Sequence, residues 1–318
     1  MDKQLKIYVA GHTGLAGSAI VRALEKSGYN NLVLKTHKEL DLLSQDKTYQ
    51  FLDLEKPDMV ILAAAKVGGI HANSTQPVNF INENLSIQNN VIHGSYLAGT
   101  QTLIFLGSSC IFPSECPQPI MEEYLLTGPL EATNRPYAIS KIAGVELCWA
   151  YNRQYGTRFL VPMPANLYGY GDNYDLNRSH VLPALIRKAH EAKSASDTSI
   201  RAWGSGNPKR EFLFSDDLAD AIVFLMQLLW DKKLAIIEQD QPPIINIGSG
   251  EEVSVAELLA LICEEVGFKG SILWDNSKPD GTPRKILDNK RLRALGWVAQ
   301  TSLRDGIKLI YQDFLRRY

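Results

Sequence analysis

The stretch 5-LKIYVAGHTGLAGSAIVRALE-25 decides the fold, because it predicts a short strand, a glycine turn and a helix in immediate succession. Residues 5–10 are mostly apolar and end at a glycine, whereas apolar side chains recur at helical spacing over 15–27. The glycines of the turn form a GxxGxxG pattern at Gly11, Gly14 and Gly17. Glycines also serve tight packing alone, but a strand before and a helix after favour a backbone that approaches a pyrophosphate at the positive end of the helix. We therefore expect a dinucleotide-binding turn.

Further short apolar runs follow this unit, at 32–34, 59–65, 103–107 and 159–163. They do not alternate with polar residues, and the segments between them have room for helices. That pattern is typical of a parallel sheet buried on both faces. We predict an α/β fold: a Rossmann-like, doubly wound parallel sheet with a smaller C-terminal α/β substrate lobe.

The pattern changes near Gly169, where we place a domain boundary. Polar loops follow up to about residue 210, interrupted by one helix-like segment at 181–193, and 211–229 predicts a strand entry followed by a long amphipathic helix. We assign 1–170 to an NADP(H)-binding Rossmann domain, which 211–247 rejoins. The substrate-binding lobe then consists of 171–210 and 248–318.

Two helices are expected in the last part of this lobe, at 254–266 and 302–317. Between them lies 275-DNSKPDGTPRK-285, whose two prolines and glycine argue against regular structure.

Composition excludes several classes of protein. At 318 residues the chain is long enough for two domains, and 33 basic against 35 acidic residues leave no overall field for nucleic acid or an anionic membrane. No apolar run approaches the roughly 18 residues of a membrane span, and the N-terminus lacks the pattern of a secretory signal. The four cysteines show neither CxxC metal spacing nor disulfide density. We expect a cytoplasmic protein with reduced thiols, no metal, and neither nucleic-acid nor membrane partners.

The segment after the second strand bears on the choice of dinucleotide. An acidic residue about 20 positions after the glycine turn usually holds the ribose 2′-hydroxyl of NAD. This chain has 35-KTHK-38 there instead. Basic groups favour a 2′-phosphate, although a solvated charged turn is the alternative. The expected cofactor is NADP(H).

A Ser, Tyr, Lys set suggests acid-base chemistry. Tyr137 and Lys141 lie four residues apart at the start of a predicted helix and so share one face. A nearby ammonium and the helix dipole would stabilise the phenolate, letting it exchange a proton with a carbonyl or hydroxyl. Ser108, after the apolar run 103–107, would supply a second hydrogen bond. A YxxxK motif without the other residues is more often an ordinary surface pair than a catalytic one.

The order of these motifs resembles the short-chain dehydrogenase/reductase superfamily, in its extended branch that modifies nucleotide sugars. The chain is similar to the GDP-L-fucose synthase family over nearly its whole length, in the segments 62-LAAAKVGGIHAN-73, 106-LGSSCIFP-113, 135-RPYAISKIAG-144, 150-AYNRQYG-156, 163-MPANLYG-169, 203-WGSGNPKREFL-213 and 278-KPDGTPRK-285. This resemblance implies a two-step conversion of GDP-4-keto-6-deoxy-D-mannose to GDP-L-fucose: epimerisation at C3 and C5, then NADPH-dependent reduction of the C4 ketone, in de novo GDP-L-fucose biosynthesis.

Epimerisation requires two further proton-transfer groups, because a 4-keto sugar acidifies the C–H bonds at C3 and C5. Cys110 lies two residues beyond Ser108, and a thiol is activated by nearby positive charge. The resemblance implies that Cys110 is the base and His180 the acid. Taken alone, Cys110 is more often a packing residue and His180 could equally cap a helix. We interpret the other cysteines as packing residues, at Cys116, Cys148 and Cys263.

A diphosphate needs basic partners, for which the second lobe offers Arg187, Lys188, Arg210 and Lys285. The resemblance places four residues in the substrate site, Lys188, Trp203, Arg210 and Asp280. Instead of binding substrate, Trp203 could be a core residue, and Arg210 could form a surface pair with Glu211.

The resemblance also implies cofactor contacts from Gly11, His12, Thr13, Gly14, Leu15, Ala16, Gly17, Lys35, His37, Lys141, Pro164, Ala165, Asn166, Leu167 and His180. The chain departs from some members at Thr13 and His37, where they carry arginines. That change removes two partners of the 2′-phosphate and leaves Lys35 and Lys38 as substitutes.

Two rival functions remain at this stage. The nearest is another nucleotide-sugar epimerase or reductase, although a 4,6-dehydratase would typically carry an Asp-Glu pair where this chain has Ser109-Cys110. A catalytically silent NADP(H)-sensing protein would keep the glycine turn but would not need the acid-base set. By analogy with the superfamily, helices at 79–98 and 137–155 would pair in a four-helix interface of a homodimer.

Overall fold

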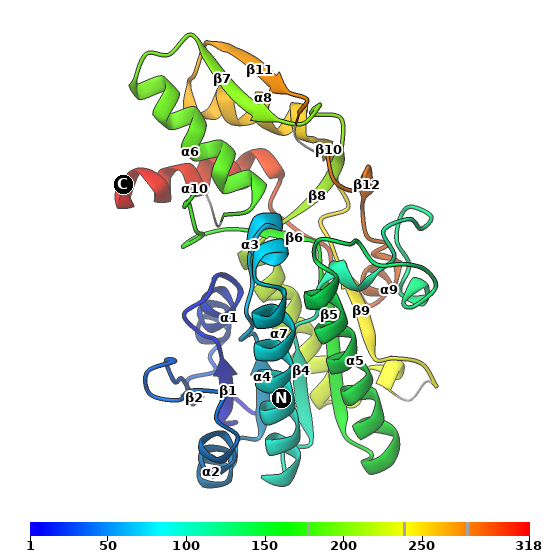
Figure 1. The fold of residues 1–318 in the computed structure, drawn as a ribbon. Coiled ribbons are helices and arrows are strands. Elements are labelled where there is room, and N and C mark those ends of the chain that lie inside the picture. The colour runs from blue at the N-terminus through cyan, green and yellow to red at the C-terminus, as the bar shows by residue number, and fades with distance from the viewer. Residues whose placement is uncertain (177–178, 238–239, 278–279) are drawn as a thin grey trace.

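The computed structural model describes residues 1–318 except 177–178, 238–239 and 278–279, and it leaves out the side chains of residues 70 and 71. Its main feature is a six-stranded, wholly parallel sheet in the order β2-β1-β3-β4-β5-β9 (Figure 1). The strands are β1 Ile7–Ala10, β2 Leu32–Val33, β3 Met59–Leu62, β4 Thr102–Phe105, β5 Arg158–Pro164 and β9 Ile244–Ile247. The predicted α/β class and all of the predicted parallel strands are confirmed.

Helices cover both faces of this sheet, which is why its strands are apolar without alternation. On one face α1 (Leu15–Lys26) packs against α7 (Ser215–Trp230); on the other, α4 (Pro77–Leu97) lies between α2 (Gln45–Glu55) and α5 (Arg135–Tyr155). The short α3 (Ile70–Thr75) precedes α4, and single turns of 3-10 helix occur at η1 Ser109–Ile111, η2 Glu122–Tyr124 and η3 Ala235–Ile237. No described helix is long and apolar enough to cross a membrane.

The order of strands reverses between β1 and β3. From β1 the chain moves outward to β2 and then returns to the other side of β1 as β3. In open α/β sheets, ligands bind outside the carboxyl ends of the strands at such a reversal. The glycine turn after β1 therefore lies where a nucleotide is expected.

A second, smaller body lies above the carboxyl ends of these strands in Figure 1. Its four-stranded sheet is built around β8, which pairs with β6, β10 and β12, and a separate pair joins β7 to β11. The strands are β6 Asn166–Tyr168, β7 Ser199–Trp203, β8 Lys209–Phe214, β10 Glu252–Ser254, β11 Ser271–Asp275 and β12 Arg284–Lys285. Apolar residues of α6 (Val181–Ser194), α8 (Val255–Val266) and α10 (Leu303–Arg317) form its separate core.

The packing differs in detail from the sequence-based division. Within 211–247, α7 and β9 pack with the large sheet, but β8 belongs to the small one. Conversely, Leu292, in the short helix α9 (Lys290–Ala294), and Trp297 pack into the large core although both were assigned to the substrate lobe. The domain limits themselves stay a prediction.

The segment 275–285 is less irregular than expected. Asp275 ends β11, and Arg284 and Lys285 form β12, parallel to β8, directly after Pro283. The expectation of no regular structure here is wrong at both ends, because proline forbids a ladder donor only at its own position and the residues after it remain free to pair.

Candidate active site

The glycine turn brings the end of β1 close to the start of α1. Gly11 has a φ of +86°, and a Cβ there would lie 2.6 Å from the Ala64 backbone nitrogen; a Cβ on Gly17 would lie 2.1 Å from the Gly11 carbonyl oxygen. Gly14 forms the N-cap of α1 without a side-chain hydrogen bond, so no cap competes for the first N–H groups of the helix. Nearby, His12 Nδ1 is buried with no hydrogen-bond partner among the described residues. These features fit the pyrophosphate of a dinucleotide.

Ser108, Tyr137 and Lys141 meet beside this turn. Ser108 follows β4 and begins η1, where its hydroxyl oxygen accepts a hydrogen bond from the Cys110 backbone N–H at 3.3 Å. Tyr137 and Lys141 lie in the first turns of α5; the tyrosine shares a hydrogen bond with the Ser108 side chain. The Lys141 ammonium donates to the Leu106 carbonyl at 2.7 Å. The structure thus assembles the three side chains that the sequence singled out.

Burial sets the protonation of this group. It raises the pKa of Tyr137 well above the usual value, as does charge on Cys110, and the hydrogen bond with Ser108 opposes the shift only in part. Burial also lowers the pKa of Lys141 to about 7. The sequence-based expectation of a stabilised phenolate is therefore wrong in direction, because desolvation and the charge of Cys110 outweigh the hydrogen bond with Ser108. Tyr137 is a neutral phenol and hence suited to give a proton.

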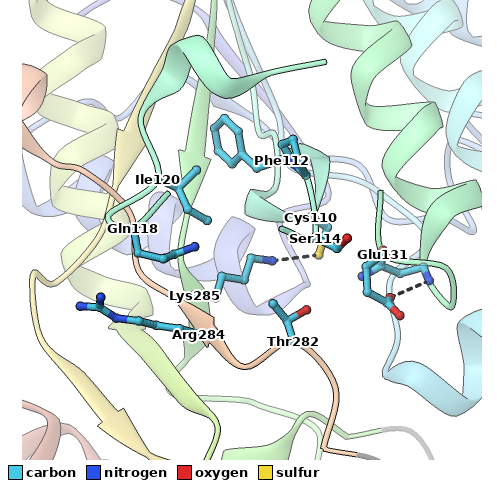
Figure 2. Close-up of a pocket in the computed structure, with 11 residues that line it drawn as sticks. Cys110, Phe112, Ser114, Gln118, Ile120, Glu131, Thr282, Arg284 and Lys285 are labelled. Atoms are coloured by element: carbon cyan, nitrogen blue, oxygen red, sulfur yellow. Dashed lines mark hydrogen bonds between the residues drawn. The ribbon is translucent and has the colours of Figure 1, made fainter. Parts of the chain in front are cut away.

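Cys110 faces a cation from the other end of the chain. The Lys285 ammonium donates a hydrogen bond to the Cys110 sulfur at a distance of 3.6 Å, across 175 residues of sequence (Figure 2). Positive charge beside a thiol stabilises the thiolate. The sequence analysis had Lys285 only among the cations for a diphosphate. No local signal could reveal the contact, because it depends on how β12 pairs with β8.

A pocket opens around this pair. Figure 2 shows Lys285, on β12, and Thr282, from the segment that leads into β12, at this pocket, with Gln118 beside Lys285. Its lining is mostly polar and comprises Cys110, Phe112, Pro113, Ser114, Gln118, Ile120, Glu131, Asn134, Thr282, Arg284 and Lys285. Asn134, at the N-cap of α5, keeps a buried side-chain oxygen without a hydrogen-bond partner among the described residues. The sequence motifs did not include Gln118, Glu131 and Asn134, and Thr282 lies within 278-KPDGTPRK-285 without having been given a role.

His180 lies at the N-cap of α6, but its side chain makes no capping hydrogen bond. The alternative of a capping histidine is therefore not supported. Desolvation lowers its pKa. Among the described residues, no hydrogen bond joins the ring to Cys110, Ser108 or Tyr137. Its part in the site stays a prediction.

The four predicted substrate residues lie along one edge of the small body. The Lys188 ammonium lies 5.3 Å from the centre of the Trp203 ring, and this tryptophan is 63% exposed, so it is no core residue. Two residues on, the backbone N–H and hydroxyl of Ser205 donate to the Asp280 carboxylate at 2.6 and 2.7 Å. Burial lowers the pKa of Arg210 and the charge of Asp280 opposes that shift, which places these two side chains near each other.

This edge connects to the pocket. Arg210 on β8 is the register partner of Lys285 on β12. Burial also lowers the pKa of Lys188, so both cations are short of water and would gain from an anionic partner. Arg187, in contrast, is engaged with Glu191 at 2.7 Å and with the Tyr174 carbonyl at 3.1 Å. Of the four candidate cations, it is the one least free for a diphosphate.

Three of the remaining cofactor candidates, Ala165, Asn166 and His37, contact other parts of the chain. The Asn166 side-chain amide donates to the Glu211 carbonyl at 2.8 Å, and the Ala165 N–H donates to the Ile247 carbonyl at 2.9 Å, so 164–167 holds the two sheets together. His37 lies 3.7 Å from Asp41. The sequence analysis overlooked Glu39, whose carboxylate accepts from the Thr36 N–H and hydroxyl. Contact of these residues with a cofactor stays a prediction.

All four cysteines are free. Cys148 and Cys263 are buried and Cys116 is half-buried, in keeping with packing roles. No cluster of potential metal ligands occurs in the part of the chain that the structure describes.

A parallel sheet with a glycine turn at its reversal point, and a Ser, Tyr, Lys set beyond the neighbouring strands, defines a nucleotide-dependent oxidoreductase of the short-chain dehydrogenase type. Residues 7–248 match the model of the NAD dependent epimerase/dehydratase family. The chain belongs to that family and, within it, to the GDP-L-fucose synthases.

The relatives cover nearly the full length. GDP-L-fucose synthase 1 of Arabidopsis thaliana is 54% identical over 315 residues, spanning 99% of this chain and 94% of the relative. GDP-L-fucose synthase of Escherichia coli K12 is 49% identical over 317 residues, 99% of this chain and 98% of the relative. Among solved structures, a GDP-D-glycero-L-gluco-heptose synthase from Campylobacter jejuni, in the presence of NADPH, is similar with a TM-score of 0.90 and 38% identity, covering 99% of both chains.

Proposed function

We propose that the protein converts GDP-4-keto-6-deoxy-D-mannose to GDP-L-fucose, by epimerisation at C3 and C5 followed by NADPH-dependent reduction of the C4 ketone. The two full-length relatives carry the name of this activity. The observation that carries the proposal is the pairing of Cys110 with Lys285 next to Ser108 and Tyr137. A simple reductase needs only Ser108 and Tyr137. A base beside them, such as Cys110, allows the configuration at the carbons next to the ketone to be inverted.

Cys110 is the base of the first step. As a thiolate held by the Lys285 ammonium, it takes the acidic proton from C3 or C5 of the keto sugar. The enolate that results needs a proton on its opposite face, and we assign that donation to His180. Desolvation lowers the pKa of His180, so its protonated form is a stronger acid but a smaller fraction of the imidazole near neutral pH, and the donation should become faster as the pH falls.

Tyr137 is the acid of the second step. Bound NADPH supplies the hydride that reduces C4. The neutral Tyr137 phenol gives its proton to the C4 oxygen while Ser108 donates a hydrogen bond to it. Lys141, anchored on the Leu106 carbonyl, stabilises the phenolate left behind when it is charged. The glycine turn, His12, Thr13, Lys35 and the 164–167 segment would hold the cofactor.

The GDP part would lie along the edge of the small body. Lys188 and Arg210 offer charge to the diphosphate, Asp280 accepts hydrogen bonds, and the exposed Trp203 ring presents a face for stacking. This assignment rests on their continuity with the Cys110 pocket through the Arg210 and Lys285 pairing.

We infer that the protein is a homodimer and acts in the cytoplasm. Exposed apolar side chains lie on the two helices of the expected interface, Val78 and Leu97 on α4, Ile139 and Tyr155 on α5. A reducing compartment would keep the Cys110 thiol free to act as a base.

The test is to mix the pure protein with GDP-4-keto-6-deoxy-D-mannose and either NADPH or NADH, follow the absorbance of the reduced cofactor, and identify the product by NMR. We expect consumption of NADPH and formation of GDP-L-fucose. No consumption with either cofactor, by folded protein that binds NADP(H), would overturn the proposal.

A second candidate is reduction or epimerisation of a different GDP-linked keto sugar. The likeness to the Campylobacter jejuni GDP-heptose synthase favours it as the alternative. Consumption of NADPH with a 4-keto GDP-heptose, but not with the 6-deoxyhexose, would decide for it.

A further inference from the structure

Glu211 is a buried carboxylate at the junction of the two bodies. It lies in β8, next to the proposed substrate residue Arg210, and only 1% of it is exposed. Among the described residues it has no ion pair. A buried charge without a counter-ion is costly unless hydrogen bonds replace its water.

Donors surround both of its oxygens. The Leu287 N–H donates to Oε2 at 2.9 Å and the Gly250 N–H to Oε1 at 2.8 Å, and further hydrogen bonds come from the Ser249 backbone and the Asn289 side chain. Gly248 leaves the room for this carboxylate, since a Cβ there would lie 2.2 Å from Oε1. Burial raises the pKa of Glu211, and these hydrogen bonds to the ionised form oppose that shift. Because both oxygens accept, the NH2 group of an amide in this place would face one of the N–H donors.

These contacts fix the strand that carries Lys285. Three backbone N–H groups define its path: that of Lys209 donates to the Pro283 carbonyl at 2.9 Å, that of Ile286 to Gln118 Oε1 at 3.0 Å, and that of Leu287 to Glu211. Lys285 lies between the first and the second, with its ammonium on the Cys110 sulfur (Figure 2). The backbone directly after Lys285 is thus held by two side chains, Glu211 and Gln118, together with the Ile120 backbone, whose N–H donates to the Ile286 carbonyl at 2.8 Å and whose carbonyl accepts from the Asp288 N–H at 2.8 Å.

We propose that Glu211 is a positioning residue for epimerisation: it anchors Leu287 to the loop at Gly250 and so keeps the Lys285 ammonium on the Cys110 sulfur. The inference rests on the proposed function and deepens it, because it extends the machinery of the first step to a residue that touches neither substrate nor cofactor. Its effect is on proton transfer at C3 and C5.

The experiment measures deuterium incorporation at C3 and C5 of GDP-4-keto-6-deoxy-D-mannose in D2O, with NADP⁺ present so that reduction does not follow. Glu211→Gln should lower the maximal rate of exchange by ~10-fold to ~100-fold, the upper figure being the loss that a misplacement of about 1 Å can cause, while the KM for the sugar changes less than about threefold. Gln118→Ala removes the second anchor and should likewise lower the maximal rate of exchange while changing the KM little. It also keeps the test decisive if Glu211→Gln does not fold.

Asp217→Asn is the matched control. Asp217 is a buried carboxylate that accepts the Thr301 N–H at 2.9 Å and hydroxyl at 3.1 Å, away from the pocket. Its loss should lower the melting temperature but leave the exchange rate of the folded enzyme unchanged.

The second readout is a double-mutant cycle with Lys285→Gln. If Glu211 acts through Lys285, Glu211→Gln adds little further loss in that background. The positioning role would be overturned if the rate losses of Glu211→Gln and Lys285→Gln multiplied in the double variant. It would also be overturned if both Glu211→Gln and Gln118→Ala exchanged at the normal rate. A wild-type enzyme that exchanges no deuterium would instead refute the proposed function, so the two failures can be told apart.

Discussion

Tyr137 has a raised pKa because it is buried, and this defines its task. A phenol that stays protonated can give its proton to a developing alkoxide, but it cannot act as a resting base. We predict that Tyr137→Phe slows reduction of the C4 ketone at least ~100-fold, the usual scale for loss of a general acid, with GDP-sugar affinity nearly unchanged. Stopped-flow oxidation of NADPH measures the first quantity and calorimetry the second. Normal turnover of the variant would remove Tyr137 from the mechanism.

The rate of reduction should depend on pH through the charge of Lys141. Its pKa is lowered to about 7 by burial, so the ammonium is present below that pH and is lost above it. If the charge stabilises the Tyr137 phenolate, the rate of the reductive step falls as the pH rises through about 7. The pH dependence of kcat with NADPH measures this. A rate that stays flat up to pH 9 would show that Lys141 acts only by its hydrogen bond to Leu106.

Cys110 should matter for proton exchange more than for binding. A serine hydroxyl is a far weaker acid than a thiol and leaves Lys285 without a thiolate to hold, so Cys110→Ser should reduce deuterium incorporation at C3 and C5 by ~100-fold or more. The affinity for the GDP-sugar serves as the control. Unchanged incorporation would refute the role of base.

Among the single residues, the sequence identified the acid-base set but not its electrostatics. Ser108, Tyr137 and Lys141 follow from spacing, because a strand end and two positions on one helix turn are local features. The pKa of Tyr137 does not, since the depth of burial depends on elements far away in the chain. For the same reason Lys285 was seen as a cation but not as the partner of Cys110.

At the scale of elements, the turn between β1 and α1 is the most constrained contact. We predict that Gly17→Ala lowers stability by about 1–3 kcal/mol, the range for overpacking, and weakens NADPH binding, because its Cβ would lie 2.1 Å from the rigid Gly11 carbonyl. Thermal unfolding and fluorescence titration with NADPH measure both effects. Gly28→Ala is the control: its φ of +83° is strained for alanine, but no atom lies within 4 Å of the added Cβ. It should lose stability while binding NADPH normally, and equal binding in both variants would contradict the role of the turn.

Helices and strands were predictable where the spacing of apolar residues follows a single pattern. The parallel strands and α1, α5, α6 and α10 follow from apolar spacing, within a few residues at their ends. By contrast, β12 lies in a segment whose prolines and glycine indicate a loop, and it forms by pairing with Lys209 and Arg210 of β8 on the side opposite β10. The placement of β8 in the small sheet was likewise invisible, since its apolar run suits either sheet.

For the molecule as a whole, the outer faces of α4 and α5 are the surface to test. If they form the interface between two copies, Leu97→Glu, at a side chain that is 57% exposed, should shift the protein from dimer to monomer. Light scattering coupled to size exclusion measures the mass, and Leu54→Glu, 82% exposed on α2, is the control that should leave it unchanged. A wild-type monomer at micromolar concentration would contradict the inferred homodimer.

The contact between Cys110 and Lys285 also imposes an order on how the enzyme comes into being. The glycine turn, Ser108, Tyr137 and Lys141 all precede Lys285 in the chain, and Lys285 is synthesised 175 residues after Cys110. A chain whose synthesis has not reached Lys285 lacks the cation that contacts the Cys110 sulfur. If Lys285 activates Cys110, the thiol becomes reactive only after synthesis has passed Lys285 and β12 has paired with β8.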